Sequence, residues 1–266
     1  MRLTDLDFAQ MYRQHMAEVG RPKSSEVWDA RAAELGVDPR LGQYGQALVD
    51  QIDLSDCQSL LDVGCGGGAI TLELARRLPR VHGIDFSAKM LEHLQQLAQS
   101  QSIHNVTCQL KSWEDDWHDV PVCDVVLASR STAVMDMEQA LTQLHSKARK
   151  RVYLTSLVGG QFADARLLNI IQRKRVEPLP GHLYVINILG QMGLRPTLDY
   201  ITSTNRYSGA RDAQAFIDLV VSGLGPLSAS EQAHLLRWVD QQGSMAAIDA
   251  AIAHQWALIS WCGNKV

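Results

Sequence analysis

Apolar residues fall into two alternating patterns along most of this chain. Short runs rich in Val, Leu and Ile are typical of strands buried on both faces of a parallel sheet. Between these runs, apolar residues recur every three or four positions, which predicts amphipathic helices. Strand and helix therefore alternate in the order that a doubly wound α/β fold requires. The seven runs cover residues 60–63, 81–84, 106–110, 122–128, 152–157, 194–204 and 256–262.

Helical periodicity also dominates two regions outside this alternation. Three helical patterns precede the first strand, and the second of them carries Trp28 and Arg31 on one face. In the region between the last two strands, Ser228 and Glu231 predict a capping box. We therefore expect N-terminal helices over residues 1–54, a core formed by 55–204 and 254–266, and a helical insertion over 205–253.

The direction of the sixth strand predicts where that insertion lies. This strand is expected to run parallel to the first, so both carboxyl ends open on the same edge of the sheet. The segment 158–193 leaves that edge as well, after the fifth strand. The insertion and this segment are therefore expected to cover a ligand bound there, although a purely structural cap is the alternative.

The first two strands end on residues suited to a nucleotide-bearing ligand. Gly64, Gly66, Gly67 and Gly68 form a turn without β-carbons, to which a ligand can come close. Asp85 ends the second strand. Because both strands of a βαβ unit end at one edge, the Asp85 carboxylate can accept hydrogen bonds from ribose hydroxyls beside the turn.

Two classes of cofactor fit these glycines. Gly64, Gly66 and Ala69 satisfy the G-x-G-x-x-G/A pattern of dinucleotide-binding folds. Asp62, inside the end of the first strand, favours another class, because a pyrophosphate binder avoids negative charge there. A carboxylate at this position suits a cofactor with an ammonium group and no phosphate. An NAD(P)-dependent oxidoreductase is therefore the less favoured alternative.

The segments LLDVGCGGG and GIDFSAKML resemble the first two motifs of class I S-adenosylmethionine (SAM)-dependent methyltransferases, particularly the UbiE-like small-molecule group. The resemblance is strong over residues 59–156 and thin elsewhere. It implies a Rossmann-like, mostly parallel seven-stranded sheet whose antiparallel last strand lies beside the sixth. It also implies SAM as methyl donor, S-adenosylhomocysteine (SAH) as product, and leading helices that lie over the cofactor edge.

The same resemblance implies a contact for each part of SAM. Core packing is the alternative role for Trp28 and for Met90. The implied contacts with the methionine part and its ammonium group are made by Asp62, Gly64, Cys65 and Gly66, with Trp28 and Arg31 closing over the methionine end. Asp85 is implied to bind the ribose, and Phe86, Met90, Ser112 and Trp113 the adenine. Ala128 and Ser129 are implied to lie beside the transferable methyl group.

The residues after the fourth strand bear on the methyl acceptor. They lack the Asn/Asp-Pro-Pro-Tyr/Phe sequence with which related enzymes hold a planar nitrogen. Arg130 is a candidate for binding an anionic substrate or the cofactor carboxylate, and pairing with Asp136 or Glu138 is the alternative. Methyl transfer needs alignment and exclusion of water more than a catalytic residue. If a base is needed, the candidates are His182, Tyr184, His234 and His15.

Composition and charge are consistent with a SAM-dependent methyltransferase and indicate which partners and locations to expect. The 266 residues are 46% hydrophobic and 20% charged, as in ordinary globular proteins, and the net charge of -4 disfavours nucleic acid as the main partner. Five widely spaced cysteines indicate buried thiols, with neither a metal site nor a disulfide framework. No signal peptide or membrane-spanning run is present, so a cytoplasmic location is expected.

These observations predict a SAM-dependent methyltransferase that acts on a small molecule. An RNA or protein methyltransferase is the second candidate, and a continuous basic channel leading from Arg173 would favour it. A catalytically silent SAM-binding protein is the third candidate.

Overall fold

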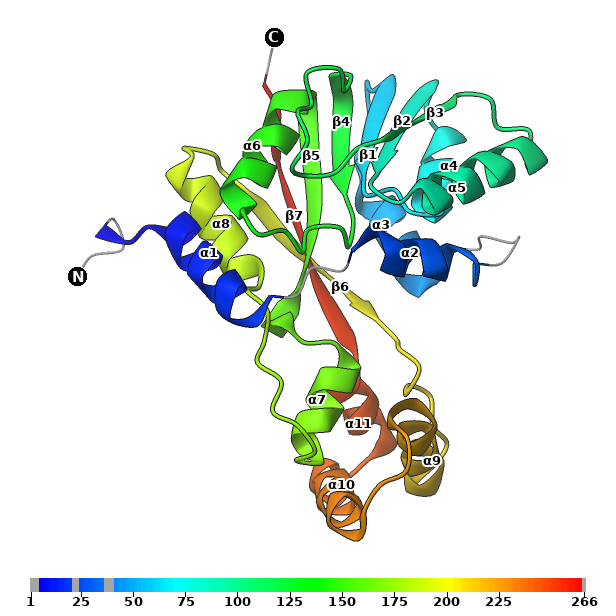
Figure 1. The fold of residues 1–266 in the computed structure, drawn as a ribbon, viewed down its shortest axis with the longest axis vertical. Helices are drawn as coiled ribbons and strands as arrows, with labels where there is room; N and C mark the ends of the chain where they lie inside the picture. Colours follow the sequence, from blue (N-terminus) through cyan, green and yellow to red (C-terminus); the bar gives the residue numbers. More distant parts are fainter. Residues whose placement is uncertain (1–4, 21–23, 36–40, 265–266) are drawn as a thin grey trace.

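The computed structural model describes residues 5–20, 24–35 and 41–264, which form a mixed sheet flanked by helices (Figure 1). The strand order is β3-β2-β1-β4-β5-β7-β6. Strand β7 runs antiparallel between β5 and β6, and the pairs among β1 to β5 are parallel. The strands are β1 (Ser59–Val63), β2 (Arg80–Asp85), β3 (Val106–Leu110), β4 (Cys123–Ala128), β5 (Ala148–Leu157), β6 (Thr197–Ser203) and β7 (His254–Cys262).

Successive residues of the central strands point to opposite faces of the sheet, and each face has its own hydrophobic core. Leu61 and Val63 of β1 pack with helices α1, α6 and α8, whereas Leu60 packs with α3 and α4. Burial on both faces explains why these strands have continuous apolar runs. The flanking helices are α1 (Phe8–Val19), α2 (Ser25–Ala32), α3 (Gln43–Gln51), α4 (Ala69–Ala75), α5 (Ala88–Ser100), α6 (Met137–Lys147) and α8 (His182–Gln191).

The glycine turn joins β1 to α4 and is bonded to the neighbouring strand. The amides of Gly64 and Cys65 both donate to the carbonyl of Ile84, at 2.8 and 3.1 Å. Gly64 has a φ of 71°, and a Cβ there would lie 2.3 Å from the Cβ of Ser131. Gly68, at φ 89°, is the N-cap of α4. Glycine is therefore required at Gly64 both by the backbone conformation and by the space available.

A separate group of helices lies beyond the ends of β6 and β7 (Figure 1). It consists of α7 (Ala163–Ile170), α9 (Ala213–Leu224), α10 (Ala229–Gln242) and α11 (Met245–Ile252). Leu167, Phe216 and Leu235 belong to one apolar cluster at its centre. We call these four helices the helical lobe. Because α7 follows β5 in the chain, the lobe is built from both segments that were expected to leave this edge of the sheet.

The predicted fold class is confirmed, including the antiparallel last strand beside the sixth. The capping box of Ser228 and Glu231 is also present, at the start of α10. Strand β5 begins at Ala148, earlier than the predicted residue 152. The predicted start is too late because Arg149 and Lys150 interrupt the apolar pattern on which it was based. Helix α11 lies within the helical insertion predicted over residues 205–253, although the pattern gives no separate bounds for it. None of the described helices is long and apolar enough to cross a membrane.

Replacing Gly68 with alanine tests the packing behind the turn. A Cβ at this position would lie 2.5 Å from Cγ of Leu94, and the backbone has positive φ. We expect Gly68→Ala to lower the free energy of unfolding by roughly 2–4 kcal/mol, measured by urea denaturation, because backbone strain and overpacking add.

Gly209→Ala is the matched control. Gly209 has a φ of 79°, but no atom lies within 4 Å of its built Cβ. In this variant the free energy of unfolding should fall only by the cost of backbone strain, about 1–2 kcal/mol. Equal losses in the two variants would contradict a packing role for the contact with Leu94.

Candidate active site

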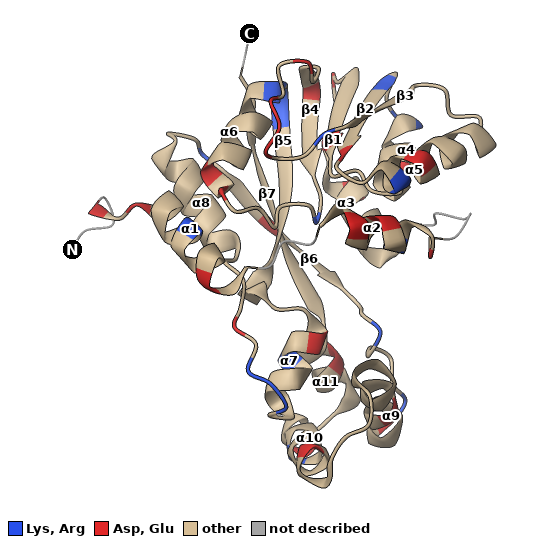
Figure 2. Ribbon diagram, in the orientation of Figure 1, with Lys and Arg blue, Asp and Glu red and all other residues tan. Residues whose placement is uncertain are grey.

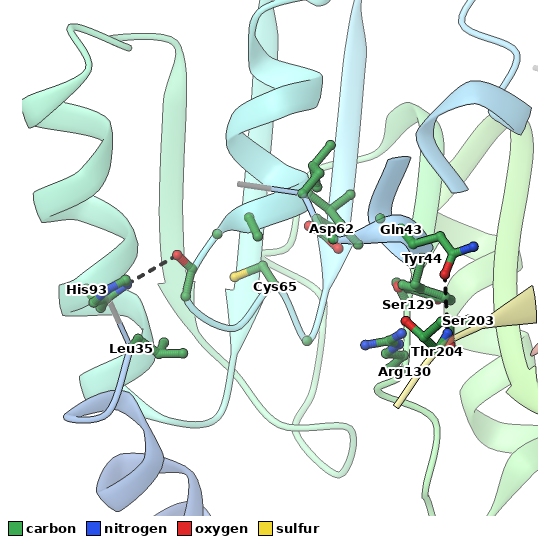
Figure 3. A pocket seen from close by; sticks show the side chains of 18 residues that line it. Leu35, Gln43, Tyr44, Asp62, Cys65, His93, Ser129, Arg130, Ser203 and Thr204 are labelled. Atoms are coloured by element: carbon green, nitrogen blue, oxygen red, sulfur yellow. Dashed lines mark hydrogen bonds between the residues drawn. The ribbon is translucent and has the colours of Figure 1, made fainter. Parts of the chain in front are cut away.

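A cavity of about 540 Å³ lies at the carboxyl edge of the sheet (Figure 3). In the close-up, polar side chains gather on one side of the cavity, Leu35 and His93 lie on the opposite side, and Asp62 and Cys65 lie between. The lining residues are Leu35, Leu41, Gly42, Gln43, Tyr44, Gly45, Asp62, Gly64, Cys65, Gly67, Gly68, Ala69, Ile70, His93, Ser129, Arg130, Ser203 and Thr204.

Asp62 contributes a buried carboxylate to this cavity. Its side chain is 2% exposed, and Oδ2 accepts a hydrogen bond of 2.7 Å from Thr71 Oγ1. Among the described residues, no cationic side chain forms an ion pair with it. Burial, and then the charge of Asp85, raise the pKa of Asp62 to about 7. A carboxylate with this much desolvation and no counter-ion fits the ammonium group of SAM.

Asp85 holds the turn from the end of β2. One carboxylate oxygen accepts from the amide of Gly66 and the other from the amide of Ser87, both at 2.9 Å. Burial raises the pKa of Asp85, and the amide hydrogen bonds oppose that shift. A carboxylate has about four acceptor sites, so Asp85 can accept a further hydrogen bond, as a ribose hydroxyl would require, but its side chain does not line the cavity.

The side chains predicted to contact the adenine do not line the 540 Å³ cavity. Phe86 is 38% exposed and Met90 is 4% exposed, so only Met90 is a core residue. In the turn after β3, the indole of Trp113 donates to the carbonyl of Ser131 at 2.9 Å. The backbone amide of Ser112 donates to Asp115 at 2.7 Å. The adenine contacts of these four residues stay predictions.

Tyr44 joins the N-terminal helices to the sheet. It lies on α3, is buried, and its hydroxyl donates to Thr155 Oγ1 at 2.8 Å. A tyrosine hydroxyl has one proton, so Ser129 Oγ, also 2.8 Å away, donates to it. The amide of Arg130 donates to the same Thr155 oxygen at 3.0 Å. Ser129 and Arg130, which follow β4, are therefore held in place by Tyr44 of α3 and Thr155 of β5 together.

The Arg130 side chain lies on aromatic rings. Its guanidinium carbon is 3.5 Å from the ring centroid of Tyr44 and 4.9 Å from that of Trp256. Ala128, just before it in β4, is fully buried and does not line the cavity. The alternative pairing of Arg130 with Asp136 or Glu138 is not formed, because both carboxylates pair with Arg13.

Helix α2 lies against α5, and its predicted cofactor residues lie outside the cavity. Asp29 accepts hydrogen bonds from the Ser87 hydroxyl at 2.6 Å and the Lys89 amide at 3.2 Å, so it anchors the helix. The guanidinium of Arg31 is 4.9 Å from the ring of Trp28. The cofactor contacts of these two residues stay predictions.

The candidate bases on α1 and α8 also lie outside the cavity. Tyr184 packs edge-on against Tyr12, with 5.8 Å between ring centroids, and 5.7 Å from His15. His182 lies 6.0 Å from Tyr200, and burial lowers its pKa. The His234 ring has a buried nitrogen without a hydrogen-bond partner among the described residues, on α10 in the helical lobe.

Three residues of this arrangement, Tyr44, Thr155 and Trp256, carry no sequence signal of a functional site. Tyr44 fits the apolar spacing of a helix, and the other two lie within strand-like runs. The one local signal of each is a polar group in a segment with an otherwise structural pattern. That signal becomes specific only once the sheet order brings β4, β5 and β7 together.

Comparisons with known proteins agree with this geometry. The family described as "Methyltransferase domain" matches residues 54–177. An uncharacterized protein of Haemophilus influenzae is 34% identical, with 100% of both chains covered. The solved structure of YcgJ from Bacillus subtilis has a TM-score of 0.56 at 14% identity, covering 84% of this chain and 99% of that chain. Coclaurine N-methyltransferase bound to N-methylheliamine and SAH has a TM-score of 0.50 at 14% identity, covering 98% and 96%.

The chain therefore belongs to the class I SAM-dependent methyltransferases, and SAM is its methyl donor. Membership in the UbiE-like group stays a prediction.

Asp62→Asn tests the pairing with the ammonium group. The amide oxygen can still accept from Thr71, but the charge is lost. We expect SAH affinity, measured by calorimetry near pH 8, to fall about a hundredfold. In the wild type, affinity should fall about tenfold per pH unit below about 7, because protonated Asp62 cannot pair. The variant should lack this dependence.

Asp62→Asn should lower the affinity for SAH but raise the thermal stability of the ligand-free protein. A carboxyl whose pKa rises on folding, here from 3.8 to about 7, costs stability as pH increases through that window. Near pH 8 the variant avoids this cost, so its melting temperature should exceed that of the wild type. A variant that loses both stability and affinity would indicate a structural role for the Asp62 charge.

Proposed function

We propose that this protein transfers the methyl group of SAM to a small-molecule acceptor. The observation that carries the proposal is the single 540 Å³ cavity that continues from Asp62 and the glycine turn to Ser129 and Tyr44. Its volume is in the range of small-molecule sites, which is about 300–1,000 Å³. A cavity of this extent can hold a methyl donor and an acceptor in one space, between the glycine turn, α3 and the residues after β4.

When bound, SAM supplies a methyl group that an electron pair on an acceptor oxygen, nitrogen or carbon displaces from sulfur, leaving SAH and a proton released by the acceptor. The chain's own residues bind and orient the reactants. Asp62 pairs with the ammonium group, and Asp85, held by the amides of Gly66 and Ser87, accepts from the ribose hydroxyls. The hydrogen-bonded Tyr44 and Ser129 fix the wall beside the acceptor. This arrangement favours alignment and exclusion of water, which are the main needs of a direct displacement.

The helical lobe is the proposed cover of the acceptor. Helix α7 is bound to the start of β7, because the amide of Ala163 donates to His254 at 3.0 Å. Phe162 packs edge-on against Trp256, with 6.0 Å between ring centroids. The lobe therefore lies next to Trp256, one of the two aromatic rings that the Arg130 guanidinium contacts. We propose that the insertion 205–253 and α7 act together in this role.

The charge distribution favours a small acceptor over RNA. Figure 2 shows basic residues on several separate elements, with acidic residues between them. Arg173 pairs with Glu231 and donates to the carbonyls of Leu224 and Pro226. Its guanidinium thus holds the lobe together, and a phosphate backbone would have to compete with these partners.

Transfer of label from methyl-labelled SAM tests the proposal. The protein is incubated separately with small-molecule, RNA and protein fractions of a bacterial extract. We expect label in the small-molecule fraction, and a loss of about a hundredfold in Asp85→Ala, because Asp85 orders the turn and binds the ribose.

Asp50→Ala, an exposed position on α3, is the control and should transfer label at the wild-type rate. Label in RNA or protein alone would contradict the small-molecule acceptor. No label in any fraction, with SAH still bound, would indicate a silent SAM-binding protein.

A further inference from the structure

We infer that the acceptor carries a carboxylate or phosphate group and that Arg130 binds this oxyanion. The inference rests on the proposed function and specifies its substrate class. It follows from three observations: how Arg130 is held in place, which buried groups around it lack ion-pair or hydrogen-bond partners, and where its guanidinium lies relative to the strands.

The backbone and side chain of Arg130 are both held in place. Its φ is 58°, a left-handed conformation that an arginine adopts only when its surroundings impose it. The amide bond to Thr155 fixes the backbone, and the ring of Tyr44 lies 3.5 Å from the guanidinium carbon. Among the described residues, Tyr44 is the one side chain whose hydrogen bond raises the pKa of Arg130, so other N–H groups of the guanidinium stay available for bidentate contact with an oxyanion.

No carboxylate among the described residues forms an ion pair with Arg130. Burial lowers the pKa of its guanidinium, which reflects a desolvated cation. The neighbouring His254, whose ring accepts the amide of Ala163, supplies no negative charge. Burial, and then the charges of Arg166 and Arg130, lower the pKa of His254, whereas the charge of Asp164 raises it. Arg130 is therefore a desolvated cation without an ion-pair partner at the cavity, which favours an anionic ligand.

Two buried polar groups near Arg130 also lack hydrogen-bond partners among the described residues. They are Ser203 Oγ and the indole nitrogen of Trp256, in residues only 3% and 4% exposed. Ser203 and Thr204 line the cavity, and Figure 3 shows them beside Arg130. Both unpartnered groups can donate a hydrogen bond, and unsatisfied buried donors are costly. An oxyanion has the acceptor capacity that such donors need.

The position of the guanidinium distinguishes an acceptor from the cofactor's own carboxylate. The amino and carboxylate groups of SAM share one carbon, so an ammonium group at Asp62 keeps the carboxylate close to β1. Arg130 instead extends toward Trp256 on β7, which is three places from β1 in the sheet. At about 4.8 Å per strand, the backbones of β1 and β7 are roughly 14 Å apart, and the Trp256 ring that the guanidinium contacts projects from β7. The oxyanion at Arg130 is therefore assigned to the acceptor.

The test combines two arginine variants with a fractionated extract. Small molecules are separated by anion exchange into retained and unretained fractions before each is incubated with protein and methyl-labelled SAM. Arg130→Gln removes the charge, and Arg149→Gln removes an exposed arginine at the opposite end of β5. SAH affinity of each protein is measured by calorimetry. A portion of the retained fraction is first treated with alkaline phosphatase.

We expect wild type and Arg149→Gln to label the retained fraction, and Arg130→Gln to label it about tenfold to a hundredfold more slowly, with SAH affinity unchanged. Loss of labelling after phosphatase treatment assigns the oxyanion to a phosphate, and unchanged labelling assigns it to a carboxylate. Labelling of the unretained fraction alone, or undiminished labelling by Arg130→Gln, would overturn the inference and leave the proposed function intact.

A tenfold loss of SAH affinity in Arg130→Gln would assign the guanidinium to the cofactor and overturn the inference as well. No labelling of either fraction by the wild type would overturn the proposed function together with the inference.

Discussion

The uncompensated charge of Asp62 is the constraint around which the site is organised. This carboxylate ends a strand that is buried on both faces, and its hydrogen bond from Thr71 cannot replace the water that burial removes. Asp85, one strand away, increases the electrostatic cost. A ligand cation beside this carboxylate would relieve that cost. The glycine turn serves the same end, because its residues line the cavity next to Asp62 without side chains.

A second group of contacts connects parts of the chain that are far apart in sequence. Tyr44 in the N-terminal region bonds to Ser129 after β4 and to Thr155 on β5, and its ring supports Arg130. The N-terminal helices are therefore part of the cavity wall. Trp256 of β7 supports the Arg130 guanidinium from behind, so the antiparallel strand has an indirect effect on the cavity. One side of the cavity is formed by Asp62 and the glycine turn, and the other by α3, the residues after β4 and the end of β6.

Much of this could be predicted because the relevant signals are local. Continuous apolar runs identified the strands, and Ser228 with Glu231 identified the start of α10. Prediction failed where a local pattern was interrupted or absent. The charges of Arg149 and Lys150 interrupt the apolar pattern at the start of β5, and no local pattern gives the bounds of α11 within the predicted helical insertion. The partner of Asp136 is Arg13, more than a hundred residues away, which no spacing rule connects to it.

Local patterns in the sequence predict the sheet, the glycine turn and the two acids beside that turn. Each of these follows from strand direction and short-range backbone geometry, which act within one βαβ unit. The tertiary structure decided which side chains meet across the cavity. It placed Arg130 on the rings of Tyr44 and Trp256 and left Tyr184 and His182 elsewhere. Contacts of this kind depend on the packing of segments far apart in the chain, so local patterns do not predict them, whereas local patterns do predict the glycine turn and the positions of the two acids.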